Sequence, residues 1–131
     1  MIQRDNKLLQ WISDLIVQTT YQCVCWDGKV KRAKVKVPLD QLQFNLEKIQ
    51  YQDQYLLDKS VNLDRKIIIY ENFMNNYQLI EDMLPWLIGI KYKVQAKCVK
   101  QNPDSIEDRV INYKELCDKL AQLGLNGYLS Y

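Results

Sequence analysis

Residues 86–98 read WLIGIKYKVQAKC, and they carry the clearest pattern in the chain. Apolar side chains occupy every second position of the stretch, and in its second half lysines and a glutamine stand between them. A repeat of two residues is typical of a strand with one buried face and one face in water. The pattern therefore predicts a long half-buried strand over residues 88–98, with Lys91, Lys93 and Lys97 on its exposed face.

Further strands are predicted on both sides of this stretch. Residues 21–26 and 30–37 are rich in strand formers, and Asp27-Gly28 between them is typical of a tight hairpin turn. Residues 66–70 contain three consecutive isoleucines, which indicates a strand that is covered on both faces and lies centrally in a sheet. A short returning strand at residues 109–111 would be the fifth.

Four helices are predicted from apolar side chains at helical spacing. Asn112 and Glu115 resemble a capping box at the start of the last helix, and Gly124 follows it as a C-terminal stop. Pro85 is expected to stop the third helix. The predicted ranges are 6–19, a segment that begins at Pro38 and fades near residue 53, 73–84, and 112–123.

The order of these elements predicts one α+β domain over residues 1–131. Its sheet is expected to be mixed or largely antiparallel, with four to five strands and with helices packed mainly on one face. A chain of 131 residues with 47% apolar residues can bury a core without metals or disulfides. The side chains expected to be buried in that core include Ile68, Ile90, Val94 and Leu116.

Composition narrows the function classes. The chain has no histidine, so the commonest general base and the usual imidazole metal ligand are missing. No apolar run approaches the roughly 18 to 20 residues that a membrane span needs, and the first residues are charged and amphipathic, unlike a secretory signal. We therefore expect a cytoplasmic, non-enzymatic domain in a reducing compartment, with no catalytic residues, no cofactor, no metal and no membrane contact.

The four cysteines are expected to be free thiols in such a compartment. Cys23 and Cys25 alternate in a predicted strand, so they share one face. A two-residue hairpin loop places them beside Arg32 and Lys34, where nearby cations lower a thiol pKa, whereas a three-residue loop places them in the core as inert packing. The sequence leaves both placements open.

The net charge of +2 hides a strong segregation of basic residues. Residues 29–36 carry five basic side chains and residues 91–100 carry four, and neither segment has an acidic one. If both predicted strands belong to one sheet, six cations project from the same face, and their mutual repulsion is relieved most easily by a bound anion. The six are Arg32, Lys34, Lys36, Lys91, Lys93 and Lys97.

These patterns give a favoured function and two alternatives. The favoured function is binding of nucleic acid or another polyanion on the basic sheet face, with Tyr21 as a stacking surface. In the first alternative the lysines only solvate an exposed face. In the second alternative the chain is an adaptor or a subunit of a larger complex. It would dock on an acidic protein surface through its basic face, or on a partner through the tyrosine-rich segment 51–57, which contains Tyr51, Tyr55 and Leu56. The oligomeric state stays open.

Overall fold

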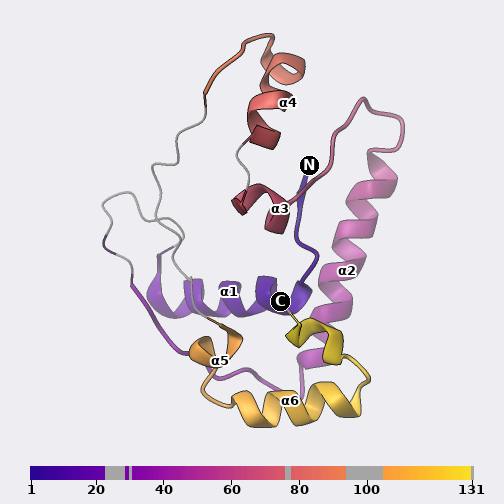
Figure 1. The fold of residues 1–131 in the computed structure, drawn as a ribbon. Helices are drawn as coiled ribbons and strands as arrows, with labels where there is room; N and C mark the ends of the chain where they lie inside the picture. The colour runs from indigo at the N-terminus through magenta and orange to yellow at the C-terminus, as the bar shows by residue number, and fades with distance from the viewer. Residues whose placement is uncertain (23–28, 30, 76–77, 94–104, 131) are drawn as a thin grey trace.

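The computed structural model describes residues 1–22, 29, 31–75, 78–93 and 105–130, and in these residues the chain is mostly helical (Figure 1). The sheet in this part of the chain has only two strands, which pair in parallel with Ile2 opposite Ile68. The predicted sheet of four to five strands is therefore wrong. The elements are β1 (Ile2–Gln3), α1 (Lys7–Thr20), α2 (Leu42–Lys59), β2 (Ile68–Ile69), α3 (Tyr70–Asn75), α4 (Gln78–Ile88), α5 (Ile106–Arg109), α6 (Tyr113–Gln122) and the 3₁₀ helix η1 (Asn126–Leu129).

Helix α1 confirms the first predicted helix. The side chain of Asn6 caps it by accepting a hydrogen bond of 2.9 Å from the main-chain N–H of Leu9. The helix buries one face, and it ends where Tyr21 takes a left-handed conformation with a φ of 53°. Tyr21 was predicted to begin a strand, and this helix end shows that it does not.

Helix α2 begins later and ends later than the sequence suggests. Pro38 starts a turn in which its carbonyl accepts a hydrogen bond of 3.1 Å from the N–H of Gln41, and the helix itself starts at Leu42. Leu42, Leu46 and Ile49 form its buried face. An ion pair of 2.5 Å between Lys7 and Asp53 fastens α2 to the start of α1 and supports the helix beyond its predicted end.

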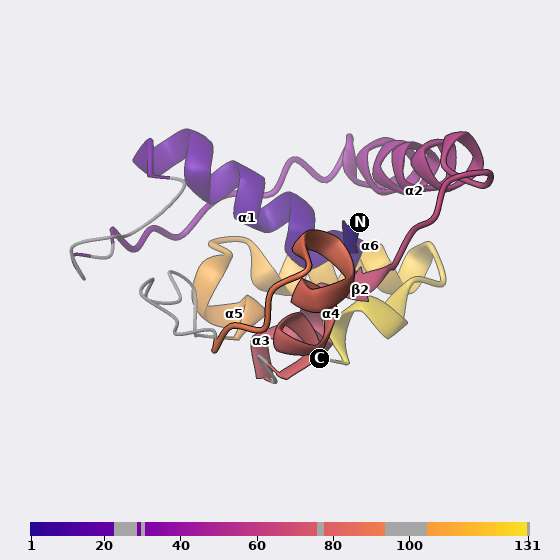
Figure 2. The ribbon, with the colours of Figure 1, turned by 90° about the horizontal axis from the view of Figure 1, so that it is seen from above.

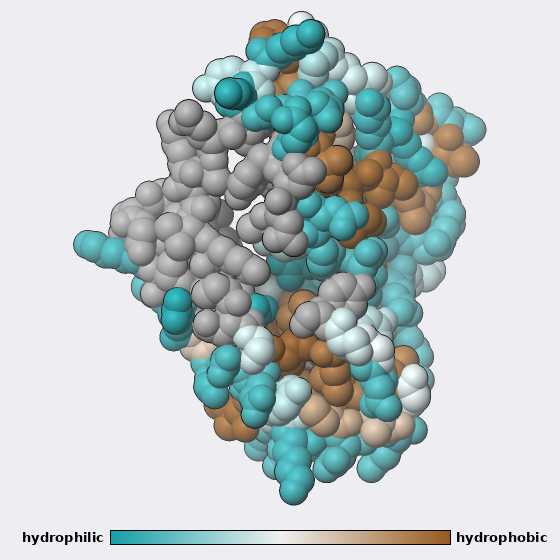
Figure 3. All heavy atoms as spheres, viewed as in Figure 1, coloured by the Kyte–Doolittle hydropathy of each residue, from teal (hydrophilic) through white to brown (hydrophobic). Residues whose placement is uncertain are grey.

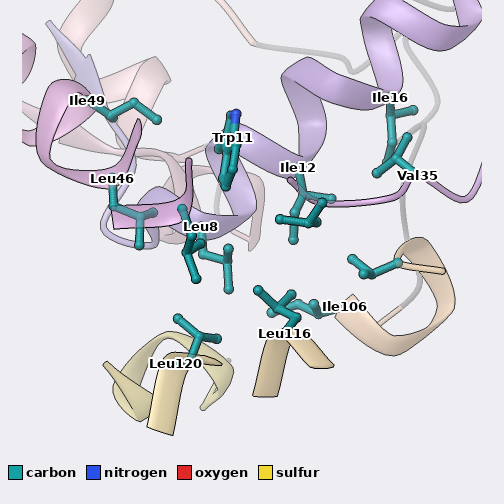
Figure 4. Close-up of a cluster of buried hydrophobic side chains, with 13 residues drawn as sticks. Leu8, Trp11, Ile12, Ile16, Val35, Leu46, Ile49, Ile106, Leu116 and Leu120 are labelled. Atoms are coloured by element: carbon teal, nitrogen blue, oxygen red, sulfur yellow. The ribbon is translucent and has the colours of Figure 1, made fainter. Parts of the chain in front are cut away.

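The core lies between α1, α2, α5, α6 and an extended segment at residues 35–37 (Figure 4). Leu8 and Ile12 of α1 are fully buried with Leu116 and Leu120 of α6. The burial predicted for Leu116 is therefore confirmed. Most of the side chains in this buried cluster come from helices and from the extended segment, so the core does not depend on a large sheet.

Within the described residues, the predicted strands 30–37 and 109–111 pair at a single bridge. Val35 and Val110 form an isolated parallel bridge, in which the N–H of Val35 donates to the carbonyl of Arg109 at 2.8 Å and the N–H of Ile111 donates to the carbonyl of Val35 at 2.9 Å. Inside the core Val35 lies next to Ile16 of α1 (Figure 4). The hairpin partner predicted at residues 21–26 falls mostly outside the described residues.

Helix α6 confirms the last predicted helix but not its capping box. Asn112 occupies the N-cap position, yet its side chain makes no capping hydrogen bond and pairs elsewhere. The predicted C-terminal stop is present, because Gly124 takes a φ of 69° that favours glycine.

The long strand predicted over residues 88–98 is wrong in its described part. Helix α4 continues through Pro85 to Ile88, and the N–H of Gly89 donates to the carbonyl of Pro85 at 3.0 Å. Ile90 was expected in the core but is 57% exposed. Val94, also expected in the core, lies outside the described residues.

The central strand predicted over residues 66–70 is the two-residue strand β2. Ile68 is buried as predicted, but its partner is the N-terminal strand and the N–H of Ile68 donates to the carbonyl of Met1 at 2.9 Å. The guanidinium of Arg4 lies 4.1 Å from the ring centroid of Tyr70, which fastens α3 to the N-terminus. The isoleucine run thus belongs to a small unit beside the helical core (Figures 1 and 2).

Candidate functional site

The basic residues 31–37 form an extended segment that passes beneath α1 on its way to α2 (Figures 1 and 2). Val35 and Val37 are buried in the core, while Arg32, Lys34 and Lys36 are exposed. The alternation predicted for these residues is therefore present, although the segment is not part of a sheet.

The main chain of Val35 and Val37 is fastened to residues 109–112. Val35 forms the bridge to residues 109–111, and Val37 is held by the side chain of Asn112. The N–H of Val37 donates to Oδ1 of Asn112 at 2.9 Å, and Nδ2 of Asn112 donates to the carbonyl of Val37 at 2.9 Å. In a continuous parallel ladder, Val37 would pair with the main chain of a neighbouring strand. Here the side-chain amide of Asn112 takes the place of that main chain. The prediction that the Asn112 side chain caps α6 is wrong, and no sequence pattern marks its role beside Val37.

The main-chain groups of Lys34 and Lys36 point to the other side. In extended backbone the N–H and C=O groups of successive residues alternate in direction, so these two residues face away from Val110 and Asn112. Among the residues that the structure describes, their main chains have no hydrogen-bond partner. We call this open side of the segment, with the exposed side chains of Arg32, Lys34 and Lys36, the basic edge.

Two sets of contacts position the basic edge. Gln22 accepts a hydrogen bond of 2.7 Å from the N–H of Lys31 and donates one of 3.1 Å to the carbonyl of Lys29, so it connects the segment to the end of α1. Lys34 Nζ approaches the carbonyl of Glu107 at 3.5 Å, which orders its side chain beside α5. At the other end of the segment lies an open depression, lined by Lys36, Val37, Pro38, Leu39, Asp40 and Asn112.

The other predicted binding residues are not brought to this edge by a common sheet. Lys91 and Lys93 are exposed and follow α4, without strand structure. Tyr21 is 91% exposed at the end of α1. Lys97 lies outside the described residues. The six cations could share one face only if both predicted strands belonged to the same sheet. No such sheet is present in the described part of the chain.

The tyrosine-rich segment lies on α2. The rings of Tyr51 and Tyr55 stack with centroids 6.5 Å apart, and both are exposed. Phe44, two-thirds exposed, lies on the same line of the helix, because positions 44, 51 and 55 fall within about 40° at 100° per residue. Leu56 is also exposed but lies about 100° away from Tyr55. Apolar surface is also visible beside the upper half of α2 (Figure 3).

Phe44 is an exposed aromatic residue that the sequence predictions did not include, although the sequence carries a signal for it. The helix was recognised from its buried side chains, and Phe44 is out of phase with them. Tyr51 follows Phe44 by seven residues, and Tyr55 follows Tyr51 by four. This spacing indicates a second apolar face on the helix.

The cysteines give no reactive centre in the described residues. Cys23, Cys25 and Cys98 lie outside them, so both placements of the first two stay predictions. Cys117 is half-buried on α6. Its side-chain hydrogen bond with Tyr113 raises the pKa of that tyrosine, and desolvation of the tyrosine raises it further. In the part of the chain that the structure covers, no group of three or more Cys, Asp or Glu residues is arranged to hold a metal ion.

Among the described residues, no helix is both long and apolar enough to cross a bilayer. Comparison with protein-family models, with curated proteins and with solved structures finds no match to this chain.

Proposed function

We propose that this chain is a non-enzymatic binding domain that docks an acidic, extended segment of a partner protein along the basic edge. The observation that carries the proposal is the open main chain of Lys34 and Lys36 between exposed cations. Strand addition of this kind uses main-chain hydrogen bonds for affinity and alternate side chains for specificity.

The spacing of the edge fits a strand with acidic side chains at alternate positions. Lys34 and Lys36 lie about 7 Å apart along extended backbone, which is also the repeat of side chains on one face of an added strand. Each main-chain hydrogen bond contributes a net of about 0.5–1.5 kcal/mol. Four such bonds are marginal by themselves, so the charges of the partner strand decide whether it binds.

The same cations select against other strands. Lysines on an open edge normally prevent pairing with apolar strands and with further copies of the same edge. An acidic strand turns this repulsion into attraction, because its carboxylates compensate Lys34 and Lys36. The edge is thus suited to an acidic partner segment and unsuited to self-pairing.

The proposal is tested with a short fluorescent peptide of alternating valine and glutamate. Its anisotropy should rise on addition of the protein, and the rise should be lost with Lys34→Glu combined with Lys36→Glu. Lys114→Glu, an exposed lysine on α6, is the matched control and should leave binding unchanged. The same peptide with N-methyl groups on alternate amides keeps its charge but cannot donate to the edge, and it should bind at least about tenfold more weakly.

Polyanion binding is the second candidate, favoured by the exposure of Arg32, Lys34 and Lys36 on one side. A single-stranded oligonucleotide titrated at two salt concentrations tests it, since phosphate contacts weaken steeply with salt. Tight oligonucleotide binding, together with peptide binding that N-methylation does not change, would show that charge alone acts here. That result would replace strand addition by polyanion binding.

A further inference from the structure

Helix α2 has two apolar faces, and only one of them is used inside the domain. Leu42, Leu46 and Ile49 are buried against α1 and α6. The opposite side carries Phe44, Tyr51 and Tyr55, which we call the aromatic seam. These rings are between about half and two-thirds exposed, although large aromatic side chains contribute strongly to binding when they are buried.

The charges beside the seam are separated by sign. At about 100° per residue, Lys48 and Lys59 lie roughly 40° and 60° to one side of Phe44. Asp58 and Glu47 lie roughly 40° and 60° to the other side. Each lysine thus lies across the seam from the acid that precedes it in the sequence. Glu47 and Lys48 lie in the first half of α2, and Asp58 and Lys59 lie at its C-terminal end.

This arrangement is complementary to itself in one orientation only. When two identical helices pack in parallel about a two-fold axis, the left flank of one faces the right flank of the other. Lys48 then meets Glu47 of the second copy, and Lys59 meets Asp58, so a symmetric pair gains four opposite-charge contacts. In an antiparallel pair identical flanks meet, and lysines would face lysines.

From this pattern we infer that α2 pairs in parallel with α2 of a second copy of this chain, through the aromatic seam. Like residues then meet along the seam, with Tyr51 beside Tyr51 and Tyr55 beside Tyr55. The basic edge lies on a different segment, so this pairing is independent of the proposed binding function.

The test is sedimentation equilibrium of the full chain across a wide concentration range. The wild type should show a reversible dimer. Tyr51→Ala combined with Tyr55→Ala should be monomeric with an unchanged unfolding midpoint, because both side chains are exposed. A wild type that stays monomeric throughout, or a dimer that this double variant does not weaken, would overturn the inference.

Charge variants then test the orientation. Lys48→Glu places acid against acid in a parallel pair and should raise the dimer dissociation constant about tenfold or more. Adding Glu47→Lys to this variant exchanges the charges at positions 47 and 48 and should restore dimerisation. Lys114→Glu should have no effect. In an antiparallel pair Lys48→Glu would instead strengthen the dimer, and that result, or a failure of the exchange to restore it, would contradict the parallel arrangement.

Discussion

Replacing Asn112 by alanine removes both hydrogen bonds that hold the main chain of Val37 beside α6. Val37 is 1% exposed, so its N–H and C=O would lose their partners inside the core. A buried polar group left unpaired costs about 1–3 kcal/mol, which gives roughly 2–6 kcal/mol for the two. The open depression beside Lys36 borders Asn112 and can admit water to these two groups, so the expected loss is in the lower half of this range, about 2–4 kcal/mol.

Urea unfolding followed by circular dichroism measures this loss. Asn112→Ala should lower the unfolding midpoint with little change in the dependence on urea. Ile111→Ala is the matched control, because the neighbouring side chain is exposed and should change the free energy of unfolding by no more than about 0.5 kcal/mol. Equal effects from the two substitutions would refute the role assigned to the Asn112 amide.

Two comparisons test the core and the end of α6. Leu116→Ala should cost about 2–5 kcal/mol of unfolding free energy because Leu116 is fully buried. Ile90→Ala should cost well under 1 kcal/mol because most of that side chain is already in water. Equal losses in urea unfolding would mean that Ile90 is packed. Gly124→Ala should cost about 1–2 kcal/mol because of its positive φ, and Gly127→Ala, where φ is not positive and nothing lies within 4 Å, should cost less in the same assay. Similar losses at the two glycines would contradict the conformation assigned to Gly124.

The sequence predicted α1 and α6 well because both depend on local signals. Asn6 precedes a regular apolar face, and Gly124 follows another, so the helix ends are marked by the residues themselves. Leu116 is buried for the same reason, since a helical repeat of leucines needs only a neighbouring apolar face to pack against.

The sheet was predicted wrongly because alternation says nothing about a strand's partner. The alternating pattern in residues 86–98 begins at Trp86, but Leu87 breaks it because it is apolar at a position that should face water. A second pattern starts earlier and has helical spacing, formed by Ile80, Met83, Leu84 and Leu87. This second pattern is the one that α4 follows as far as Ile88. Pro85 did not stop the helix.

The candidate site was predicted in part. The exposed positions of Arg32, Lys34 and Lys36 follow from their alternation with apolar neighbours. The open main-chain edge does not, because it depends on Asn112, which lies 75 residues from Val37 and pairs with it by a side-chain amide. Contacts of this range leave no local pattern in a single sequence.

Residue-resolved amide hydrogen exchange, measured by NMR with and without the acidic peptide, tests the central claim most directly. In the free protein the amides of Val35 and Val37 should exchange slowly, and those of Lys34 and Lys36 should exchange fast because their N–H groups have no partner in the described structure. Addition of the peptide should slow exchange at Lys34 and Lys36 specifically. Slow exchange at these two amides in the free protein, or no change at them when the peptide is bound, would contradict strand addition at the basic edge.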